Sequence, residues 1–589
     1  MNMNVQTIEN KTLEYDVVIM GGGFAGLCQA RHLMLNIPNI QIAIIDPRPE
    51  NRTDKDLKIG ESTVEIAATF LAKDLGLFNY LVDNQLPKYG LNFHWPKKPN
   101  QTNNHDDYYN IWTSHQPAIP SFQLNRAKFE QDLLKMNQEM GATFYNGRVV
   151  DFELTAGDET KTVEVKLGDN KVSLKTKHVI DAAGRNFLIG KKTDNLVFDS
   201  ENLQGVNNGS AWMRIKNVDR FLFDDDYHPN RNIVSHYYGT NHYFGNGHWL
   251  WMIPIDNQEK ELSIGIIHHH DVISAKSINT KEKFLGFLQT NHTILYNLIV
   301  NSEQVDFHYR PKLAHKSKTM FSANNWYVIG DAASIFDAFY SLGTSMIAFA
   351  IESVTEIIRA KLAGEADAEE KRAVYNEYNL TFANTANTIV SNHPHQLGHA
   401  SIMSWRIYFD YMWWFGVLVP MYIGKWHLDI GFLNEFLSPF RTCINELIPE
   451  VYEQFEQLVE KNANIGLMDC YRADQLLWGY NTLKHFDEFL ENTKLEPQRS
   501  NVYRGMKHTF FYMAIWYIML QWKGFGIQSL FRPRRIYYFF YLLALSFISA
   551  IGELRHQFKL GNLPDNTEVQ QMREEFKSYQ YQPLVLPRS

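Results

Sequence analysis

The stretch Asp16-Val-Val-Ile-Met20, followed directly by Gly21-Gly-Gly-Phe-Ala-Gly26, decides the fold of this chain. Its first five residues form the short β-branched run that is typical of a buried parallel strand. The G-x-G-x-x-G turn is expected to open a helix over residues 27–35, and residues 40–45 predict a second strand that closes on Asp46. Strand, turn, helix, strand and acid in this order predict a dinucleotide-binding unit.

Each part of this unit has a physical role in holding a dinucleotide. Gly21 permits the tight turn, Gly23 lets the backbone approach a pyrophosphate, and Gly26 lets the helix pack closely on the strand. The helix N-terminus offers free N–H groups and a partial positive charge to the phosphates. Asp46, twenty residues beyond Gly26, lies where a carboxylate accepts ribose hydroxyls. We therefore expect the cofactor to contact Gly21, Gly23, Phe24, Ala25, Gly26 and Asp46.

Length and composition set broad limits on the class of protein. A chain of 589 residues is long enough for two or three domains, and 45% hydrophobic content is enough to bury a large core. The 65 acidic residues outnumber the 57 basic ones, and the resulting charge of −8 argues against general nucleic-acid binding. Aromatic residues make up 14% of the chain, which suits large apolar pockets or surfaces.

The cysteines and the N-terminus bear on the cellular compartment. Cys28, Cys443 and Cys470 are far apart and odd in number, so neither a disulfide framework nor a C-x-x-C site is expected. Residues 1–10 have neither a basic start nor an apolar run, and no signal peptide is predicted. Both observations favour a cytoplasmic enzyme.

The remaining strand signals predict one nucleotide domain that is interrupted by a substrate domain. Residues 178–181 and 325–330 are typical of buried strands, and each ends in a small-residue turn. Between them, alternating stretches from Ala211 to His268 predict an antiparallel sheet, within a substrate domain of about residues 200–310. The predicted architecture is α/β, with a core over residues 1–395 and a helical region over 396–589.

Two further helices are predicted in the N-terminal half. Ser62 or Thr63 is expected to cap a helix that runs to Leu75. Residues 123–126 introduce an amphipathic helix over residues 127–140.

Two later features carry a resemblance to a known family. Trp249-Leu-Trp-Met-Ile-Pro254 fits a W-x-W-x-I-P signature at every fixed position. Lys88 lies five residues before Phe93 and downstream of a Gly-Glu strap, Gly60-Glu61. On these residues the chain resembles the flavin-dependent halogenases, including the tryptophan halogenases, over residues 14–360. The resemblance implies an FAD-binding domain of the glutathione-reductase type, a Rossmann-like fold.

A third feature is the loop Phe336-Asp-Ala-Phe-Tyr-Ser-Leu-Gly343, which follows Gly330-Asp331. It is similar to the F-x-P-x-x-S-x-G loop of the same family but carries Ala338 where proline is usual. The change removes the φ restriction of proline, which puts the rigidity of the loop in doubt but not its serine and glycine.

The resemblance implies a chemistry in which reduced FAD, oxygen and a halide (chloride or bromide) give hypohalous acid. The protein then supplies positioning, electrostatics and exclusion of side reactions. Lys88 would receive the oxidised halogen, as a haloamine or by hydrogen-bonding hypohalous acid, and present it to the substrate. An amine near its reference pKa of about 10.4 is protonated at neutral pH, so a haloamine requires a buried lysine with a lowered pKa.

The resemblance also implies roles for residues other than Lys88. Ser341 is expected to be a second catalytic residue, and the Gly343 N–H, at the start of a helix, is expected to bind halide together with Thr344. The residues expected to bind FAD also include Gly60, Glu61, Arg126, Gly330, Asp331 and Gly343.

An aromatic wall is expected between flavin and substrate. Trp249 and Trp251 point the same way if their segment is a strand, and the alternative is that they are ordinary core aromatics. The resemblance favours a wall made of Trp249, Trp251, Pro254, Phe336 and Tyr340. Tyr340 stands where tryptophan halogenases carry a glutamate that takes the proton from the ring. A phenol, which activates its own ring, is therefore favoured over free tryptophan.

The run His268-His-His270 raises the question of a metal site. Adjacent residues on a strand point to opposite faces, and no second cluster has ligand spacing. We expect a solvated strand end and no metal.

Three uncharged, aromatic-rich runs mark the C-terminal third: residues 411–424, 509–522 and 536–552. The stretch from Arg504 to His556 contains seven basic residues and one acidic residue, Glu553. This pattern is typical of peripheral attachment to a membrane surface, and the alternative is a set of helices that covers the active site and forms a lipophilic pocket. Both interpretations favour a lipophilic substrate.

The sequence as a whole predicts an FAD-dependent halogenase that acts on a lipophilic phenol. A separate flavin reductase is expected to supply reduced flavin, because a second G-x-G-x-x-G unit for a nicotinamide cofactor is not visible. The alternatives are a flavin monooxygenase that hydroxylates, a related reductase that acts on lipids, and a flavin-binding membrane scaffold without turnover.

Overall fold

The computed structural model describes residues 13–52, 59–112, 119, 121–157, 159–219, 236–256, 260–468 and 502–560. The predictions made from residues 1–10 and from Cys470 lie outside these ranges.

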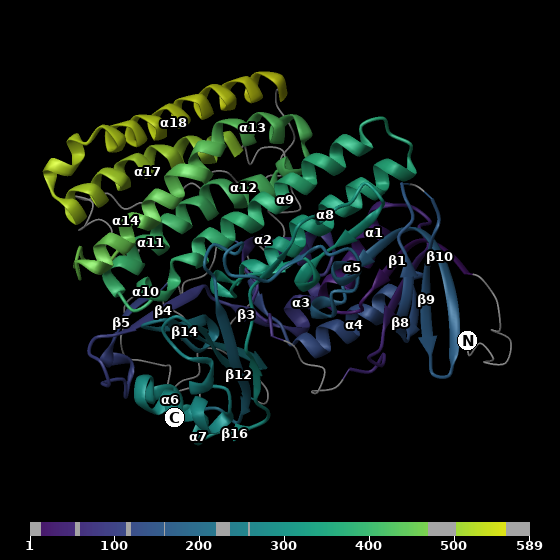
Figure 1. The fold of residues 1–589 in the computed structure, drawn as a ribbon, viewed down its shortest axis with the longest axis horizontal. Coiled ribbons are helices and arrows are strands. Elements are labelled where there is room, and N and C mark those ends of the chain that lie inside the picture. Colours follow the sequence, from purple (N-terminus) through teal and green to yellow (C-terminus); the bar gives the residue numbers. More distant parts are fainter. Residues whose placement is uncertain are drawn as a thin grey trace.

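A seven-stranded sheet forms the centre of the nucleotide domain (Figure 1). Its parallel strands are β1 (Leu13–Met20), β2 (Ile42–Asp46), β7 (Thr143–Asn146), β10 (Asn170–Asp181) and β19 (Trp326–Val328). β9 (Lys161–Leu167) and β8 (Arg148–Glu153) extend it in antiparallel fashion. Helix α1 (Phe24–Asn36) joins β1 to β2, so the predicted strand, turn, helix and strand are confirmed.

The chain leaves this sheet after β10 and returns to it at β19, with a second sheet in between. β12 (Asn208–Lys216), β13 (Thr240–Gly245), β14 (His248–Asp256) and β15 (Glu261–His269) pair in antiparallel fashion, as predicted. The sheet also contains β4 (Leu91–Pro96) and β5 (Tyr108–Trp112), which precede it in sequence. β4 pairs with β13 in parallel, a long-range pairing that the sequence pattern does not reveal.

The remaining elements complete the two halves around these sheets. They include β3 (Leu86–Lys88), β6 (Ser121–Gln123), β11 (Leu196–Val197), β16 (Glu303–Gln304), β17 (His308–Arg310), β18 (His315–Ser317), β20 (Ser334–Ile335), α3 (Phe78–Asn84), α5 (Leu188–Lys192), α6 (Lys281–Asn291) and α7 (Thr293–Val300). β3 and β6 pair with each other in antiparallel fashion.

The two predicted helices of the N-terminal half are present, with one difference in capping. α4 (Arg126–Glu139) begins after Asn125, whose side chain accepts from the Lys128 N–H. α2 (Glu65–Thr69) continues as the π-helical turn η3 (Phe70–Asp74) and begins after Val64, without a side-chain cap. The predicted cap by Ser62 or Thr63 is wrong because the Thr63 hydroxyl donates to the Phe122 carbonyl instead.

The described C-terminal part is helical and lies along one side of both sheets (Figure 1). After α8 (Leu342–Leu362) it comprises α9 (Ala368–Ser391), α10 (His393–Gln396), α11 (Ala400–Trp413), the π-helical turn η11 (Trp414–Leu418), α12 (Val419–Ile423), α13 (Ile430–Thr442), the π-helical turn η13 (Cys443–Leu447), α14 (Ile448–Glu460), α17 (Val502–Phe525), η14 (Ile527–Phe531) and α18 (Pro533–Leu560).

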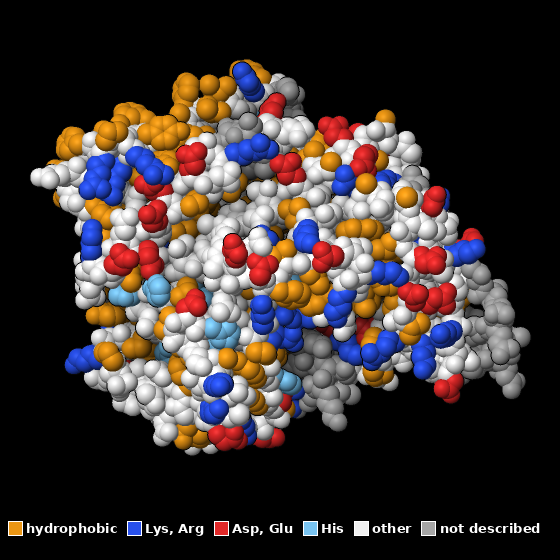
Figure 2. Space-filling model, in the orientation of Figure 1, with side chains coloured by type: hydrophobic (Ala, Val, Ile, Leu, Met, Phe, Trp, Pro, Cys, Tyr) orange, Lys and Arg blue, Asp and Glu red, His pale blue; other side chains and the backbone are white. Residues whose placement is uncertain are grey.

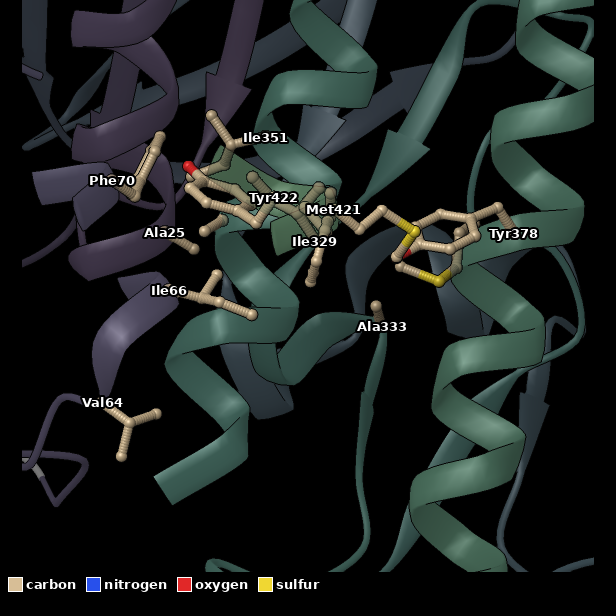
Figure 3. Packing of buried hydrophobic residues seen from close by; sticks show 14 of the residues in the cluster. Ala25, Val64, Ile66, Phe70, Ile329, Ala333, Ile351, Tyr378, Met421 and Tyr422 are labelled. Atoms are coloured by element: carbon tan, nitrogen blue, oxygen red, sulfur yellow. The ribbon is translucent and has the colours of Figure 1, made fainter. Parts of the chain in front are cut away.

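One hydrophobic core runs from the nucleotide sheet into these helices. Figure 3 shows Ala25 and Ile351 of the nucleotide domain close to Met421 and Tyr422 of α12. The same buried cluster extends to Leu545 of α18. The C-terminal helices therefore share the core of the nucleotide domain.

Candidate functional site

The glycine-rich turn has the shape that a pyrophosphate needs. Gly21 has a φ of +119°, and a Cβ there would lie 2.3 Å from the Ala182 carbonyl oxygen. A Cβ on Gly26 would lie 1.9 Å from the Gly21 carbonyl oxygen, so this contact between helix and turn requires glycine. At Gly23 the nearest atom to a Cβ would be an Arg48 nitrogen at 3.5 Å, which leaves the backbone accessible to a ligand. The first turn of α1 has neither a side-chain cap nor an acidic residue, so its N–H groups suit phosphates.

Asp46 ends β2 beside this turn. Its Oδ2 accepts from the Gly22 N–H at 2.7 Å, and Arg48 donates to both carboxylate oxygens at 3.1 Å. Burial alone would raise the pKa of Asp46, but the hydrogen bonds and charge of Arg48 hold it below its usual value. The carboxylate is therefore ionised, as acceptance of ribose hydroxyls requires. Arg48 is a residue that the sequence reasoning missed, although it stands two positions after Asp46.

The strap at Gly60-Glu61 connects the predicted flavin side to a tryptophan. Arg126 donates to the Gly60 carbonyl at 3.2 Å, and its guanidinium carbon lies 4.8 Å from the centre of the Phe24 ring. Burial raises the pKa of Glu61, while a hydrogen bond from the Ser263 hydroxyl opposes this. The Ser263 oxygen accepts from the Trp251 indole N–H at 3.1 Å. Four predicted cofactor residues thus lie in one network with Trp251.

The second predicted flavin segment, Gly330-Asp331, lies against the glycine-rich turn. Gly330 has a φ of +62°, and a Cβ there would lie 2.9 Å from the Ala25 side chain. The Asp331 side chain is exposed, and its backbone carbonyl accepts from His315 at 2.8 Å. The two predicted cofactor segments therefore meet beyond the carboxyl ends of β1 and β19, where α/β sheets bind their ligands.

The two tryptophans of β14 point to the same face of the second sheet. Trp249 and Trp251 are 1% and 4% exposed, and their ring centres lie 6.0 Å apart, in a buried cluster that includes Tyr340. Leu250 and Met252 belong to the cluster on the opposite face. Their predicted common orientation is confirmed.

Two residues predicted for the wall do not join this pair. Alternation along β14 turns Pro254 to the face opposite Trp251. Phe336 is buried in a separate cluster with Leu203 and Ala314. Phe93 and Phe339 pack with Trp249 in their place, and the sequence reasoning did not assign them to the wall.

Lys88 ends β3 and is 1% exposed. Its Nζ donates to the Thr63 carbonyl at 2.7 Å. Burial lowers the pKa of Lys88 to about 7, and the charge of Glu65 opposes this shift. The lysine charge also acts on His242, whose ring centre lies 5.3 Å from that of Trp249. The amine is thus buried, has a lowered pKa, and is close to the residues that pack against the tryptophan pair.

The loop before α8 carries two residues in an uncommon conformation. Tyr340 and Ser341 have φ values of +60° and +58°, in the left-handed region that residues other than glycine rarely adopt. The Ser341 N–H donates to the Ala338 carbonyl at 3.1 Å, so the turn forms without the usual proline. Gly343 is exposed and a Cβ there would have no atom within 4 Å, whereas Thr344 is buried. Among the described residues, Ser341 makes no hydrogen bond to Lys88.

The Tyr340 hydroxyl is held by a carboxylate from the C-terminal helices. It donates to Asp410 of α11 at 2.8 Å, and the Tyr452 hydroxyl donates to the other oxygen of the same carboxylate at 2.5 Å. Burial raises the pKa of Asp410 to about 6, with Arg406 opposing. Burial and the nearby Asp410 charge raise the pKa of Tyr340 well above its usual value. Tyr340 is therefore a neutral hydrogen-bond donor.

The run His268-His-His270 is not a solvated strand end. The prediction is wrong because the first two residues of the run are buried in β15: His269 packs against His393 of α10 on one face, and His268 packs against Tyr309 of β17 on the other. His269, Asp337 and His393 have ligand atoms within 4.8 Å of one another, a spacing that could hold a metal ion. Asp337 already accepts from the Trp249 indole N–H at 3.0 Å and lies 3.4 Å from His393 Nδ1. These bonds stabilise the buried carboxylate and fix the orientation of Trp249.

Comparison with known proteins decides the family. The chain is 39% identical over 593 residues to the flavin-dependent halogenase chlA of Dictyostelium discoideum, covering 96% of this chain and 97% of that protein. The chain belongs to the flavin-dependent halogenases. The predicted resemblance is confirmed, and the sequence profile of the tryptophan halogenase family matches residues 104–395 of this halogenase.

Two further relatives extend the comparison. The 1H-pyrrole-2-carbonyl-[peptidyl-carrier protein] chlorinase of Pseudomonas fluorescens is 24% identical over 349 residues, covering 56% of this halogenase and 73% of that protein. The crystal structure of halogenase PltM in complex with phloroglucinol and FAD has a TM-score of 0.56 at 17% identity, covering 91% of this halogenase and 96% of that chain. The latter shows a shared fold.

This halogenase is an FAD-dependent oxidoreductase, and its residues fit the cofactor. The uncapped start of α1, the glycines that allow no Cβ and the ionised Asp46 suit the pyrophosphate and ribose. Of the residues that sequence reasoning missed, Asp337 occupies a variable position of the Phe336–Gly343 loop and Asp410 stands in no motif. They act on partners from other elements, Trp249 and Tyr340, and only the fold brings them together.

Proposed function

We propose that this halogenase uses reduced FAD, oxygen and chloride or bromide to halogenate a lipophilic phenol through Lys88. The observation that carries the proposal is the burial of Lys88, which lowers its pKa to about 7 close to the aromatic cluster of Trp249. An exposed lysine would stay protonated and would not be a nucleophile.

Lys88 carries the halogen in two steps. Bound reduced FAD supplies, with oxygen and halide, hypohalous acid. The Lys88 amine attacks the halogen, so that an N–X bond forms, the O–X bond breaks, and hydroxide leaves with the amine proton as water. A ring carbon then takes the halogen from nitrogen, and the ring proton restores the amine. Gly343 and Thr344, at the first turn of α8, are the proposed halide site because N–H groups at a helix start bind anions.

The substrate class follows from the groups near Lys88. Tyr340 is neutral and its hydroxyl is bonded to Asp410, so it does not take a ring proton. A substrate that activates its own ring by losing a phenolic proton needs no such base. Phe93, Phe244 and Trp249 belong with Tyr340 to one buried apolar cluster, and apolar surroundings favour lipophilic substituents. PltM, whose structure contains phloroglucinol, is a relative in fold that binds a phenol.

We further propose that a separate reductase supplies the reduced flavin in the cytoplasm. The chain has one G-x-G-x-x-G unit, at Gly21–Gly26, and its three cysteines are far apart in the sequence, which suits a reducing compartment. Purified protein is therefore expected to oxidise NADPH only slowly unless a flavin reductase is added. Rapid oxidation by the protein alone would contradict this part.

The test is to incubate the protein with a flavin reductase, bromide and a panel of phenols and indoles, and to read products by isotope pattern. Lys88→Ala, and Lys88→Met, which keeps most of the side-chain volume, are expected to give no brominated product. Bound FAD and oxygen consumption are expected to stay unchanged in both variants. Lys97→Ala, at an exposed lysine, is the matched control and keeps activity. Bromination by both Lys88 variants at the normal rate would defeat the proposal.

The same assay separates the other candidate functions. A monooxygenase would add oxygen to the substrate with or without bromide. A flavin-binding scaffold would retain FAD without oxygen consumption beyond that of free flavin.

A further inference from the structure

The outer face of α18 is apolar over most of its length. Its exposed positions from residue 536 to residue 554 carry no charge, and the large side chains among them recur at helical spacing: Ile536, Tyr537, Phe540, Phe547, Ile548, Ile551 and Leu554, continued by Phe558. Phe547 is 68% exposed and Phe558 is 88% exposed. At about 1.5 Å per residue this row is about 33 Å long. Figure 2 shows it as a band of hydrophobic side chains along the edge of the molecule formed by α18.

The inner face of α18 holds the polar groups that a surface helix normally turns outward. Glu553 is bonded to Lys507 of α17 at 2.6 Å, and the Ser546 hydroxyl donates to the Lys507 carbonyl at 2.8 Å. The side chain of Ser549 is also buried. The inner face also buries Tyr538, Leu542 and Leu545 in the core, so α18 is apolar on both faces and its few polar side chains point inward. An exposed apolar face of this length is typical of an interaction surface.

Positive charges mark both ends of the apolar row. Arg532 is exposed at its start and Arg555 at its end, with Lys523 exposed in the preceding helix. Arg534, also exposed at the start, is paired with Glu450 of α14 at 2.7 Å and adds no net charge there. The chain as a whole carries a charge of −8, so this basic edge is a local feature. Apolar side chains between basic ends match the acyl boundary and the phosphates of an anionic lipid surface.

We propose that α18 with η14 docks this halogenase on the surface of an anionic lipid bilayer. α18 lies along α17 through the face that carries Leu542, Leu545 and Glu553, so it can lie in the plane of a membrane without breaking the Lys507–Glu553 pair. Ile527 and Phe531 of η14, 61% and 74% exposed, extend the same apolar edge. The proposal concerns docking and does not depend on the substrate or on Lys88.

Two other arrangements fit the described residues less well. Pro533–His556 is long and apolar enough to cross a membrane, as is the mostly buried Phe339–Leu362, but only 28% of the former is buried inside the protein. Crossing would separate the Lys507–Glu553 pair and expose charge to lipid. A second copy of the chain would pair α18 with α18, and in either direction the basic end of one helix would meet a basic end of the other.

The expected behaviour is that full-length protein sediments with phosphatidylcholine vesicles that contain phosphatidylserine, and weakly with phosphatidylcholine alone. Phe540→Gln with Phe547→Gln is expected to reduce the partition coefficient about tenfold or more, because both changes remove apolar surface that the bilayer would bury. Val300→Gln, at an exposed apolar residue of α7, is the matched control and binds normally. Arg532→Gln with Arg555→Gln is expected to remove the preference for phosphatidylserine.

Retention of bound FAD and a wild-type far-UV circular dichroism spectrum establish that each variant is folded. Wild-type protein that stays in the supernatant with both vesicle types would overturn the proposal. Equal binding by the Phe540/Phe547 double variant would also overturn it. Dimerisation that depends on these two residues, without vesicle binding, would assign the face to a second copy instead.

Discussion

At the scale of single residues, two opposing influences set the pKa of Lys88. Burial lowers its pKa to about 7, and the Glu65 carboxylate, which is held by the Trp414 indole N–H at 2.7 Å, opposes this shift. A pKa near 7 leaves about half of the amine uncharged at neutral pH, whereas a value near 10.4 leaves well under 1%. The buried position thus supplies free amine without an adjacent base.

Haloamine formation at Lys88 is expected to increase with pH through a midpoint of about 7 and to level off by about pH 9. The lysine is protonated below its pKa and reacts only as the free amine. The measurement is the rate of chlorination of Lys88 by added hypochlorite, quantified by peptide mass spectrometry at a series of pH values and divided at each pH by the fraction of oxidant present as hypochlorous acid. In Glu65→Gln the midpoint should move to lower pH, because the charge that raises the pKa is gone. A corrected rate that still increases steeply above pH 9 would contradict the assignment.

Tyr340→Phe is expected to lower stability and leave phenol halogenation within a few-fold of wild type. The change removes a buried hydroxyl that donates to Asp410 at 2.8 Å, at a cost of roughly 1–3 kcal/mol. Tyr452→Phe, which removes the other hydroxyl on Asp410, is the matched control and should cost about the same. The measurements are urea denaturation and turnover of one phenol. Loss of turnover in the Tyr340 variant alone would make Tyr340 a participant in catalysis.

At the scale of elements, a close contact between η11 and α17 fixes how these two C-terminal elements pack. Gly416 lies in the π-helical turn η11, and a Cβ there would lie 1.5 Å from the Thr509 hydroxyl of α17. π-helical turns insert an extra residue and often occur at functional sites. This one begins at Trp414, the residue bonded to Glu65, so the contact with α17 helps to position the environment of Lys88.

Gly416→Ala is expected to destabilise the protein by about 1–3 kcal/mol, because the added methyl group overlaps Thr509 and must push α17 away. Gly286→Ala is the control in α6, where a Cβ would meet no atom within 4 Å. That change should be neutral or stabilising by up to about 1 kcal/mol, since alanine favours the helix. Thermal denaturation of both variants is the measurement, and equal effects would show that η11 and α17 separate at no cost.

Elements with a local signature could be predicted from the sequence, and those made by distant pairing could not. The unit at Asp16–Asp46 and the strand that carries Trp249 are defined by β-branched runs, glycines and alternation. β4 joins β13 across a long stretch of chain, and the pattern of neither strand reveals the other. His269 was misread for the same reason, since Asp337 and His393 come from a loop and a helix far along the chain.

At the scale of the whole molecule, a buried ionic cluster joins the C-terminal helices to the nucleotide domain. Glu352 of α8 accepts from the Tyr422 hydroxyl at 2.8 Å and lies 2.7 Å from His427 Nε2. Lys425, at the end of α12, binds both Glu352 and Asp74. Burial alone would raise the pKa of Glu352, but Lys425 and His427 hold it well below its usual value. Its contribution is therefore present at neutral pH and is lost as the pH falls toward that lowered value.

Glu352→Ala is expected to destabilise the whole molecule by about 1–3 kcal/mol, because it leaves the buried His427 ring without its acceptor and Lys425 with Asp74 as its remaining carboxylate partner. Glu377→Ala, which removes one partner of the exposed Arg441–Glu377 pair, is the control and should cost less than about 1 kcal/mol. Urea denaturation followed by both FAD release and loss of helix signal is the measurement. Since one core spans the nucleotide domain and these helices, the two signals should move together to lower urea. FAD release that keeps its wild-type midpoint while the helix signal shifts would mean that the C-terminal helices unfold as a separate unit.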